Sequence, residues 1–157
     1  MATRALAIRD AIITELQKIG VTPGSGWESG AGAPQVLPGR PRRDAIPETP
    51  ERQLWVQHGR TEAKLEGFTA AGGLYRATFI VWLACPDSLA GQDLVSKLER
   101  DVRRALQNGE AALQGSTLAN AGIYEDVFEA RDDMAQAGVY VGTVAVLAEF
   151  LTAKGDP

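Results

Sequence analysis

Residues 74–84, Leu-Tyr-Arg-Ala-Thr-Phe-Ile-Val-Trp-Leu-Ala, decide the fold of this chain. Apolar side chains occupy every second position, and this period of two is typical of a strand with one buried face. The other face begins with the polar residues Arg76 and Thr78. It ends with Ile80 and Trp82, so we expect this end to be covered as well. The face expected in the core consists of Tyr75, Ala77, Phe79, Val81 and Leu83.

Two amphipathic helices are predicted on either side of this strand, over residues 4–19 and 89–107. Both carry apolar residues at intervals of three and four, which is the helical period. Thr3 is the expected N-cap of the first helix, and Gly20 is expected just beyond its end. On the second helix, Lys97/Asp101 and Glu99/Arg103 have the spacing of ion pairs. We expect Phe79 and Val81 to pack against Leu98 and Val102 of this helix.

Three further strands are predicted, over residues 52–65, 123–130 and 139–150. The element order is then α-β-β-α-β-β. The sequence predicts a single α+β domain spanning residues 1–157, with a mainly antiparallel four-stranded sheet and the helices packed on it.

Residues 22–50 hold six of the eight prolines and five glycines, so neither a helix nor a central strand is expected there. Loops this long are usually functional or disordered. We therefore predict an extended Pro/Gly-rich loop that leaves the domain and contacts a neighbouring protein. Trp and Arg are enriched at interface hot spots, which makes Trp27, Arg40, Arg42 and Arg43 the expected anchors.

The composition excludes several classes of site. The chain has one cysteine, Cys85, and one histidine, His58, so an intramolecular disulfide and a zinc site with several Cys or His ligands are both excluded. The net charge of −4 argues against a dedicated nucleic-acid binder. No apolar run reaches the ~20 residues of a membrane span. These features are typical of a soluble domain in a reducing compartment.

Searches for chemistry in the sequence yield no catalytic, cofactor-binding or metal-binding residue. Gly24, Gly26 and Gly30 look like a phosphate loop but lack its spacing and its preceding strand. His58 has no evident nucleophile or orienting acid and is expected on the surface or at an edge, whereas Cys85 is expected to be a small buried hydrophobe. A carboxylate cluster without metal-binding spacing is expected to be solvated; it comprises Glu125, Asp126, Glu129, Asp132 and Asp133.

Charge is distributed unevenly along the chain. Residues 1–43 carry a net charge of +3, residues 44–109 of −1 and residues 110–157 of −6. Opposite charges at the two ends favour head-to-tail association, in which the basic region of one copy meets the acidic region of the next.

The layout of the whole chain resembles that of the tail terminator, or tail completion, proteins of tailed bacteriophages. Four features carry the resemblance: an N-terminal helix containing Arg-Asp-Ala-Ile-Ile-Thr-Glu-Leu at 9–16, a long loop leading into Leu-Trp-Val-Gln-His-Gly at 54–59, the strand at 75–83 with the capped helix that follows it, and a C-terminal hairpin. The resemblance is one of arrangement, because the family has no catalytic signature to match. The loop at 22–50 is longer than the family layout requires.

The resemblance implies a structural virion protein without catalytic residues or cofactors. Such proteins form six-fold rings on the last ring of the tail tube, end its polymerisation and join the tail to the head connector. Genomic DNA passes through the ring without specific binding, and assembly takes place in the host cytoplasm. Expected contacts to the ring or tube are the strands at 53–60 and 139–150, together with Trp55 and the loop residues named above; the acidic C-terminal third is expected to face the lumen.

Two other interpretations remain open at this stage. A head-side neck or connector protein has a similar size and composition. A small α+β enzyme of ferredoxin-like shape is disfavoured by the shortage of His and Cys, although Asp and Glu chemistry stays possible.

Overall fold

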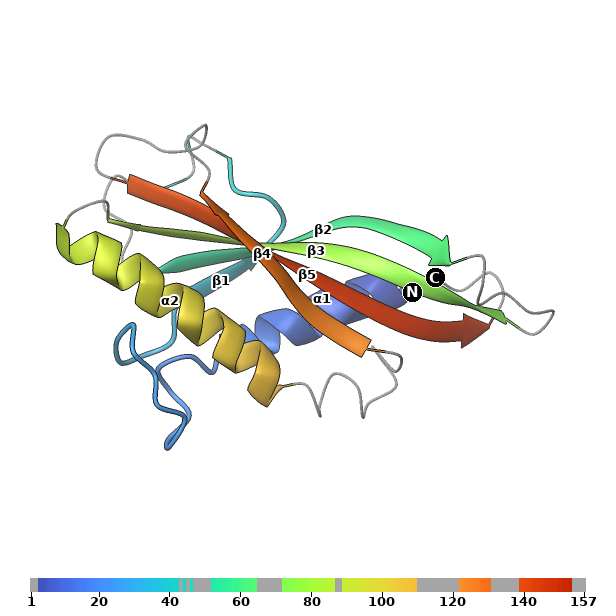
Figure 1. Cartoon of the computed structure of the whole chain (residues 1–157), viewed down its shortest axis with the longest axis horizontal. Coiled ribbons are helices and arrows are strands. Elements are labelled where there is room, and N and C mark those ends of the chain that lie inside the picture. The colour runs from blue at the N-terminus through green and yellow to red at the C-terminus, as the bar shows by residue number, and fades with distance from the viewer. Residues whose placement is uncertain are drawn as a thin grey trace.

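A five-stranded sheet with two helices forms the fold (Figure 1). The computed structural model describes residues 3–42, 44, 46, 52–64, 72–86, 89–109, 122–130 and 139–153. Along the chain the elements are α1 (Arg4–Leu16), β1 (Gln35–Pro38), β2 (Gln53–Lys64), β3 (Gly72–Pro86), α2 (Leu89–Asn108), β4 (Gly122–Ala130) and β5 (Val139–Ala153). In space the strand order is β1-β2-β3-β5-β4.

The α+β class is confirmed, but the predicted four-stranded sheet and element order are wrong by one strand. β1 lies inside the segment expected to be a loop, and it pairs with β2 in parallel, whereas the other three pairings are antiparallel. The sheet is therefore mixed. Pro34 directly precedes β1, and Pro38 is its last residue. Proline is tolerated at these positions because β1 is an edge strand of only four residues.

β3 and β5 form the spine of the sheet. Each has 15 residues, and they pair from Gly72 with Ala153 to Pro86 with Val139. In Figure 1 these strands run the length of the molecule, with α2 along one half and α1 along the other. A bulge between His58 and Arg60 in β2, and another between Glu125 and Phe128 in β4, interrupt the outer pairings. Bulges of this kind increase the local twist.

Both helices pack on the same face of the sheet and enclose the main core. Phe79, Val81, Leu98 and Val102 are all fully buried in this one cluster, as the sequence predicted. Cys85 is also fully buried there, which confirms its expected role as a small hydrophobe. None of the helices in the described ranges is both long enough and apolar enough to span a membrane.

The first helix ends earlier than its apolar pattern suggested. Thr3 caps it as predicted, because its hydroxyl accepts a hydrogen bond from the Leu6 amide at 3.3 Å. The last helical residue is Leu16, and a series of turns follows. Ile19 is nevertheless fully buried, so the apolar spacing continues past the end of the regular helix.

Candidate functional site

The segment between α1 and β1 is fastened to α2 by a buried carboxylate. Asp101 is fully buried and accepts hydrogen bonds from the backbone amides of Glu28 and Ser29, the latter at 2.8 Å. The Ser29 hydroxyl donates to the same carboxylate at 2.5 Å. Buried carboxylates persist only when hydrogen bonds replace their hydration, and here three loop donors do so. The predicted Lys97/Asp101 pair is wrong, since Lys97 pairs with Asp93 at 2.7 Å.

Two arginines hold the same loop through its carbonyl groups. Arg52, just before β2, donates to the carbonyls of Ala31 at 2.9 Å and of Gly32 at 2.5 Å. Arg104 of α2 donates to the carbonyl of Gly26. The loop is therefore attached from both sides, by α2 and by the residue that leads into β2. Each arginine satisfies backbone acceptors that a loop would otherwise present to water.

The expectation that this loop leaves the domain is wrong for residues 26–32. Their backbone is occupied by Asp101, Arg52 and Arg104, so this stretch lies against its own domain. A contact between the loop and a neighbouring subunit remains a prediction. Of the rest of the segment, residues 43, 45 and 47–50 lie outside the described residues.

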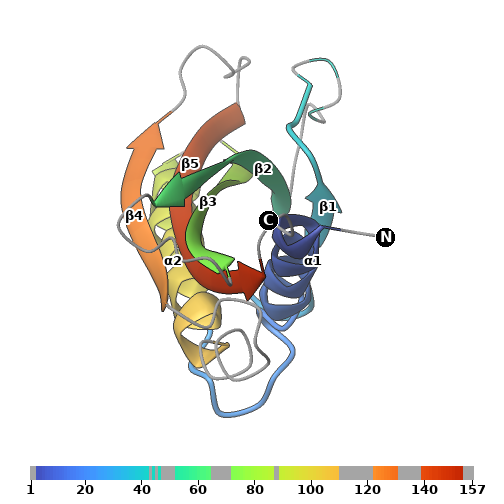
Figure 2. The same cartoon turned by 90° about the vertical axis from the view of Figure 1, so that its right-hand side faces the viewer.

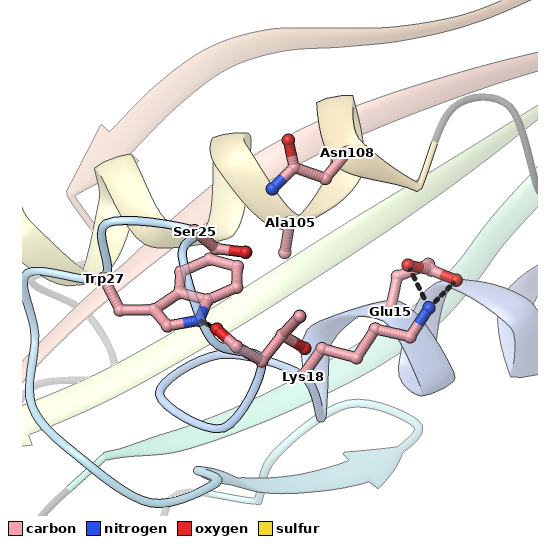
Figure 3. Close-up of a pocket in the computed structure, with 7 residues that line it drawn as sticks. Glu15, Lys18, Ser25, Trp27, Ala105 and Asn108 are labelled. Atoms are coloured by element: carbon pink, nitrogen blue, oxygen red, sulfur yellow. Dashed lines mark hydrogen bonds and ion pairs between the residues drawn. The ribbon is translucent and has the colours of Figure 1, made fainter.

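A small pocket opens between this loop, the end of α1 and the last turn of α2 (Figure 3). Its volume is about 160 Å³, and Figure 3 shows the Trp27 ring on one side and the Glu15–Lys18 ion pair on the other. Lys18 Nζ lies 2.8 Å from both carboxylate oxygens of Glu15. The lining residues are Glu15, Lys18, Thr22, Ser25, Trp27, Ala105 and Asn108.

The pocket combines an aromatic wall with polar groups at its rim. The Trp27 indole N–H donates to the Thr22 carbonyl at 3.0 Å, which fixes the ring and leaves its face for contact. Gly109 lets the end of α2 come close to Glu15, because a Cβ at this position would lie 2.5 Å from Glu15 Cγ. A cavity of this size accommodates one small polar molecule or one side chain of a partner.

The sheet face opposite the helices, which we call the outer face, is the second surface of interest. Only one end of it is covered within the described residues: Trp55, Trp82 and Ile46 form a second buried cluster there. Cross-strand partners share a face, and the register places Ile80 opposite Ala145 and Leu74 opposite Leu151. The less buried outer-face apolar residues are Leu74, Ile80, Ala145, Leu147 and Leu151.

The structure describes four of the five predicted contact residues, and these four lie in different environments. Trp55 is only 5% exposed and belongs to the chain's own second cluster, so it has little surface for a partner. Trp27 is half-buried and packs on the main core. Arg40 is exposed, and its guanidinium carbon lies 5.3 Å from the centre of the Trp82 ring. Arg42 is also exposed, at 3.6 Å from Asp44. Arg43 lies outside the described residues.

The remaining residues considered for chemistry lie in separate elements wherever the structure describes them. His58 lies within β2, half-buried, with Nε2 2.8 Å from the Thr61 hydroxyl. Gly24, Gly26 and Gly30 have positive φ angles. Glu129 is exposed, whereas the side chains of Glu125 and Asp126, and all of Asp132 and Asp133, lie outside what the structure describes. Within the described ranges, no group of three His, Cys, Asp or Glu residues is placed to hold a metal ion.

Sequence reasoning missed the role of Asp101. Its position falls beside Leu98 and Ala105 on the wheel of α2, within the apolar stripe. A charged residue in such a stripe is the signal that could have revealed a buried, partnered carboxylate. No protein-family model and no curated protein matches the sequence of this chain.

Proposed function

We propose that this chain is a structural virion protein that acts as a phage tail terminator. It forms a ring that covers the growing end of the tail tube, ends polymerisation and joins the tail to the head connector. The layout of the sequence supports this proposal through its resemblance to that family. The observation that carries it is the outer face of the sheet.

The outer face has the character of a protein contact surface. Both helices lie on the opposite side. On the outer face Leu151 is 53% exposed and pairs with the less buried Leu74, and Leu147 lies four positions earlier on the same strand. Grouped apolar side chains on a surface indicate a binding partner. The Arg76–Glu149 ion pair, at 2.6 Å, adds a polar element to the same face. The register places this pair between the Leu74–Leu151 pair and Leu147, so apolar and polar groups alternate along the face. Interfaces between folded subunits commonly combine apolar and polar groups.

Termination by such a protein needs no chemical step. The ring occupies the surface that the next tube ring would use and offers no copy of that surface. The bound state then depends on buried area and fit, so loss of apolar contact should weaken it directly. Tube protein, connector protein and further copies of this chain are the expected partners, with DNA passing through the lumen.

Tube assembly with purified proteins tests this function. Added to polymerising tube protein, the chain should shorten the tubes seen by electron microscopy, and labelled chain should lie at tube ends. Leu147→Asp on the outer face should abolish this effect. Val21→Asp is the matched control, because Val21 is 58% exposed but lies in the turn after α1. Unchanged tube length with the wild-type chain would refute the proposal.

Gene disruption separates a terminator from a head-side neck protein. Loss of a terminator should give overlong tails that are not joined to heads. Tails of normal length beside DNA-filled heads would instead identify the chain as a neck protein.

A further inference from the structure

The pocket beside Trp27 lies where both helices end. α1 ends at Leu16 and α2 at Asn108, and residues from each last turn line the pocket. Figure 2 shows the loop between α1 and β1, in light blue, passing from one helix to the other. The backbone carbonyls of a last helical turn carry partial negative charge, and neither last turn contains a basic residue. The position of the pocket therefore favours a cation.

Glu15 strengthens this preference, because its carboxylate lines the pocket while its side chain is only 8% exposed. The Lys18 ammonium already binds there, with Nζ 2.8 Å from both carboxylate oxygens. The Lys18 side chain is 49% exposed, so it can turn into the solvent without unpacking the core. Lys18 thus marks a position for a cation and also occupies it.

Trp27 supplies an aromatic wall opposite this ion pair (Figure 3). Among aromatic side chains, the face of an indole attracts cations most strongly. The ring is held in place before a ligand arrives, because its N–H donates to the Thr22 carbonyl and the next two backbone amides are bonded to Asp101. Preorganisation of this kind lowers the entropic cost of binding.

A carboxylate opposite an aromatic face suits a planar cation better than a compact one. A guanidinium group stacks on an indole and presents parallel N–H groups to both oxygens of a carboxylate, whereas an ammonium is a strongly hydrated point charge. The pocket volume of about 160 Å³ is sufficient, since a cavity of ~150 Å³ binds benzene. Ser25 and Asn108 also line the pocket, and their hydroxyl and amide oxygens can accept hydrogen bonds from the remaining N–H groups.

We propose that this pocket binds a guanidinium group, which stacks on Trp27, pairs with Glu15 and displaces the Lys18 ammonium from the carboxylate. A free guanidinium compound and an arginine side chain of another protein present the same chemistry. Lys18 acts as an internal competitor that keeps the carboxylate paired when no ligand is bound. The pocket lies between the helices and their loop, on the side of the sheet opposite the outer face, so it does not depend on the proposed tube contact.

Titration with methylguanidinium, followed by ¹H–¹⁵N NMR, tests the site. The indole N–H signal of Trp27, assigned by its loss in Trp27→Phe, should shift. The signals of Trp55 and Trp82 should not, because these residues are 5% and 2% exposed. Methylammonium has the same charge and should cause a smaller shift at equal concentration. Trp27→Leu should weaken binding roughly tenfold, measured from the backbone amide of Ala105, because the contact of the cation with the ring is lost.

Two lysine substitutions separate displacement of Lys18 from a general effect of charge. Lys18→Met and Lys97→Met each remove one positive charge, but Lys97 pairs with Asp93 and does not line the pocket. Lys18→Met should tighten methylguanidinium binding several-fold, since the pocket no longer has to release its own cation. Lys97→Met should leave the Kd unchanged. Glu15→Gln should abolish binding, and unchanged Trp55 and Trp82 signals would show that this variant is folded.

A blocked peptide with one arginine between glycines distinguishes the two sources of the group. Binding of this peptide as tightly as methylguanidinium would identify a protein arginine as the occupant, whereas binding of methylguanidinium alone would identify a free compound.

The site would be overturned by a Trp27 signal that methylguanidinium does not move at any concentration that leaves the fold intact. An equal shift with methylammonium would also overturn it, as would equal affinities of the Lys18→Met and Lys97→Met variants. None of these results bears on tube capping, which the tube-length assay measures separately.

Discussion

Ser29 and Asp101 are joined by two hydrogen bonds across 72 positions of sequence: the Ser29 amide and hydroxyl both donate to the Asp101 carboxylate. Ser29 lies in the loop between α1 and β1, whereas Asp101 lies in α2, so the two residues meet only in the folded chain. The pair fixes the loop before β1 to the middle of α2. Its energetic importance can be measured directly, because α2 also carries an exposed aspartate for comparison.

Asp101→Ala should lower the free energy of unfolding by about 3 kcal/mol. The substitution leaves the amides of Glu28 and Ser29 and the Ser29 hydroxyl without their acceptor. One hydrogen bond to a charged group contributes ~1.5–3 kcal/mol, and removal of the buried charge, which no longer has to be desolvated, offsets part of the loss of the three bonds. Urea unfolding followed by circular dichroism measures the change. Asp93→Ala is the control, since this side chain is 68% exposed and its pair with Lys97 is a solvent-screened surface pair that should contribute little to stability. Equal effects of the two substitutions would contradict the buried role of Asp101.

Hydrogen exchange should show that residues 28–29 are protected in the isolated chain. The Ser29 amide is bonded to a fully buried carboxylate, so exchange there requires the loop to detach from α2. Asp101→Asn should accelerate this exchange, because the amide NH₂ cannot accept the bonds that the carboxylate accepts. Fast exchange of Ser29 in the wild-type chain would instead show that the loop is detached in solution.

Gly20→Ala should destabilise the fold more than Gly24→Ala. Both glycines have φ near +75°, which costs alanine ~1–2 kcal/mol. At Gly20 an added Cβ would also lie 2.6 Å from the Gly32 carbonyl oxygen, whereas at Gly24 it would meet nothing within 4 Å. Thermal unfolding of both variants checks the order. Similar melting temperatures of the two variants would mean that the backbone around residue 20 shifts to accommodate the added Cβ without loss of stability.

Phe79→Ala should cost about 3–5 kcal/mol, through lost burial and the cavity left behind. Phe79 is fully buried between the sheet and the helices. Ile80→Ala, one position along on the outer face, should cost less because Ile80 is only partly buried. Denaturant unfolding of the two variants compares the faces of one strand. The prediction fails if Ile80→Ala is the more damaging change.

The helices, the four longer strands and the main core could be predicted from the sequence because they have clear periodicity. Phe79 and Leu98 each lie in a regular apolar pattern, and both are fully buried. β1 could not be predicted in this way. The four residues of Gln35–Pro38 are too few to show alternation, and the pairing of β1 with β2 depends on contacts distant in the sequence.

Predictions of which residues contact a partner were less successful than the predictions of helices and strands. Trp55 was expected at a ring or tube contact together with the strand at 53–60, yet it fills the second cluster of its own chain. Residue type does not separate a buried tryptophan from an exposed one. The expectation that the loop leaves the domain was wrong for a related reason. Its proline and glycine content predicts an irregular backbone, but it does not reveal that the Asp101 carboxylate on α2 binds that backbone.

The continuous pairing of β3 with β5 has a mechanical consequence. Fifteen residues at ~3.4 Å each make strands of roughly 50 Å, and the two remain in register from one end to the other. Tension that pulls the two strands lengthwise in opposite directions would act on all their hydrogen bonds at once, as shear, instead of opening them one after another. The long axis of this molecule is thus its stiff direction. A subunit seated at a joint between two large assemblies would resist stretching best when that axis follows the direction of strain.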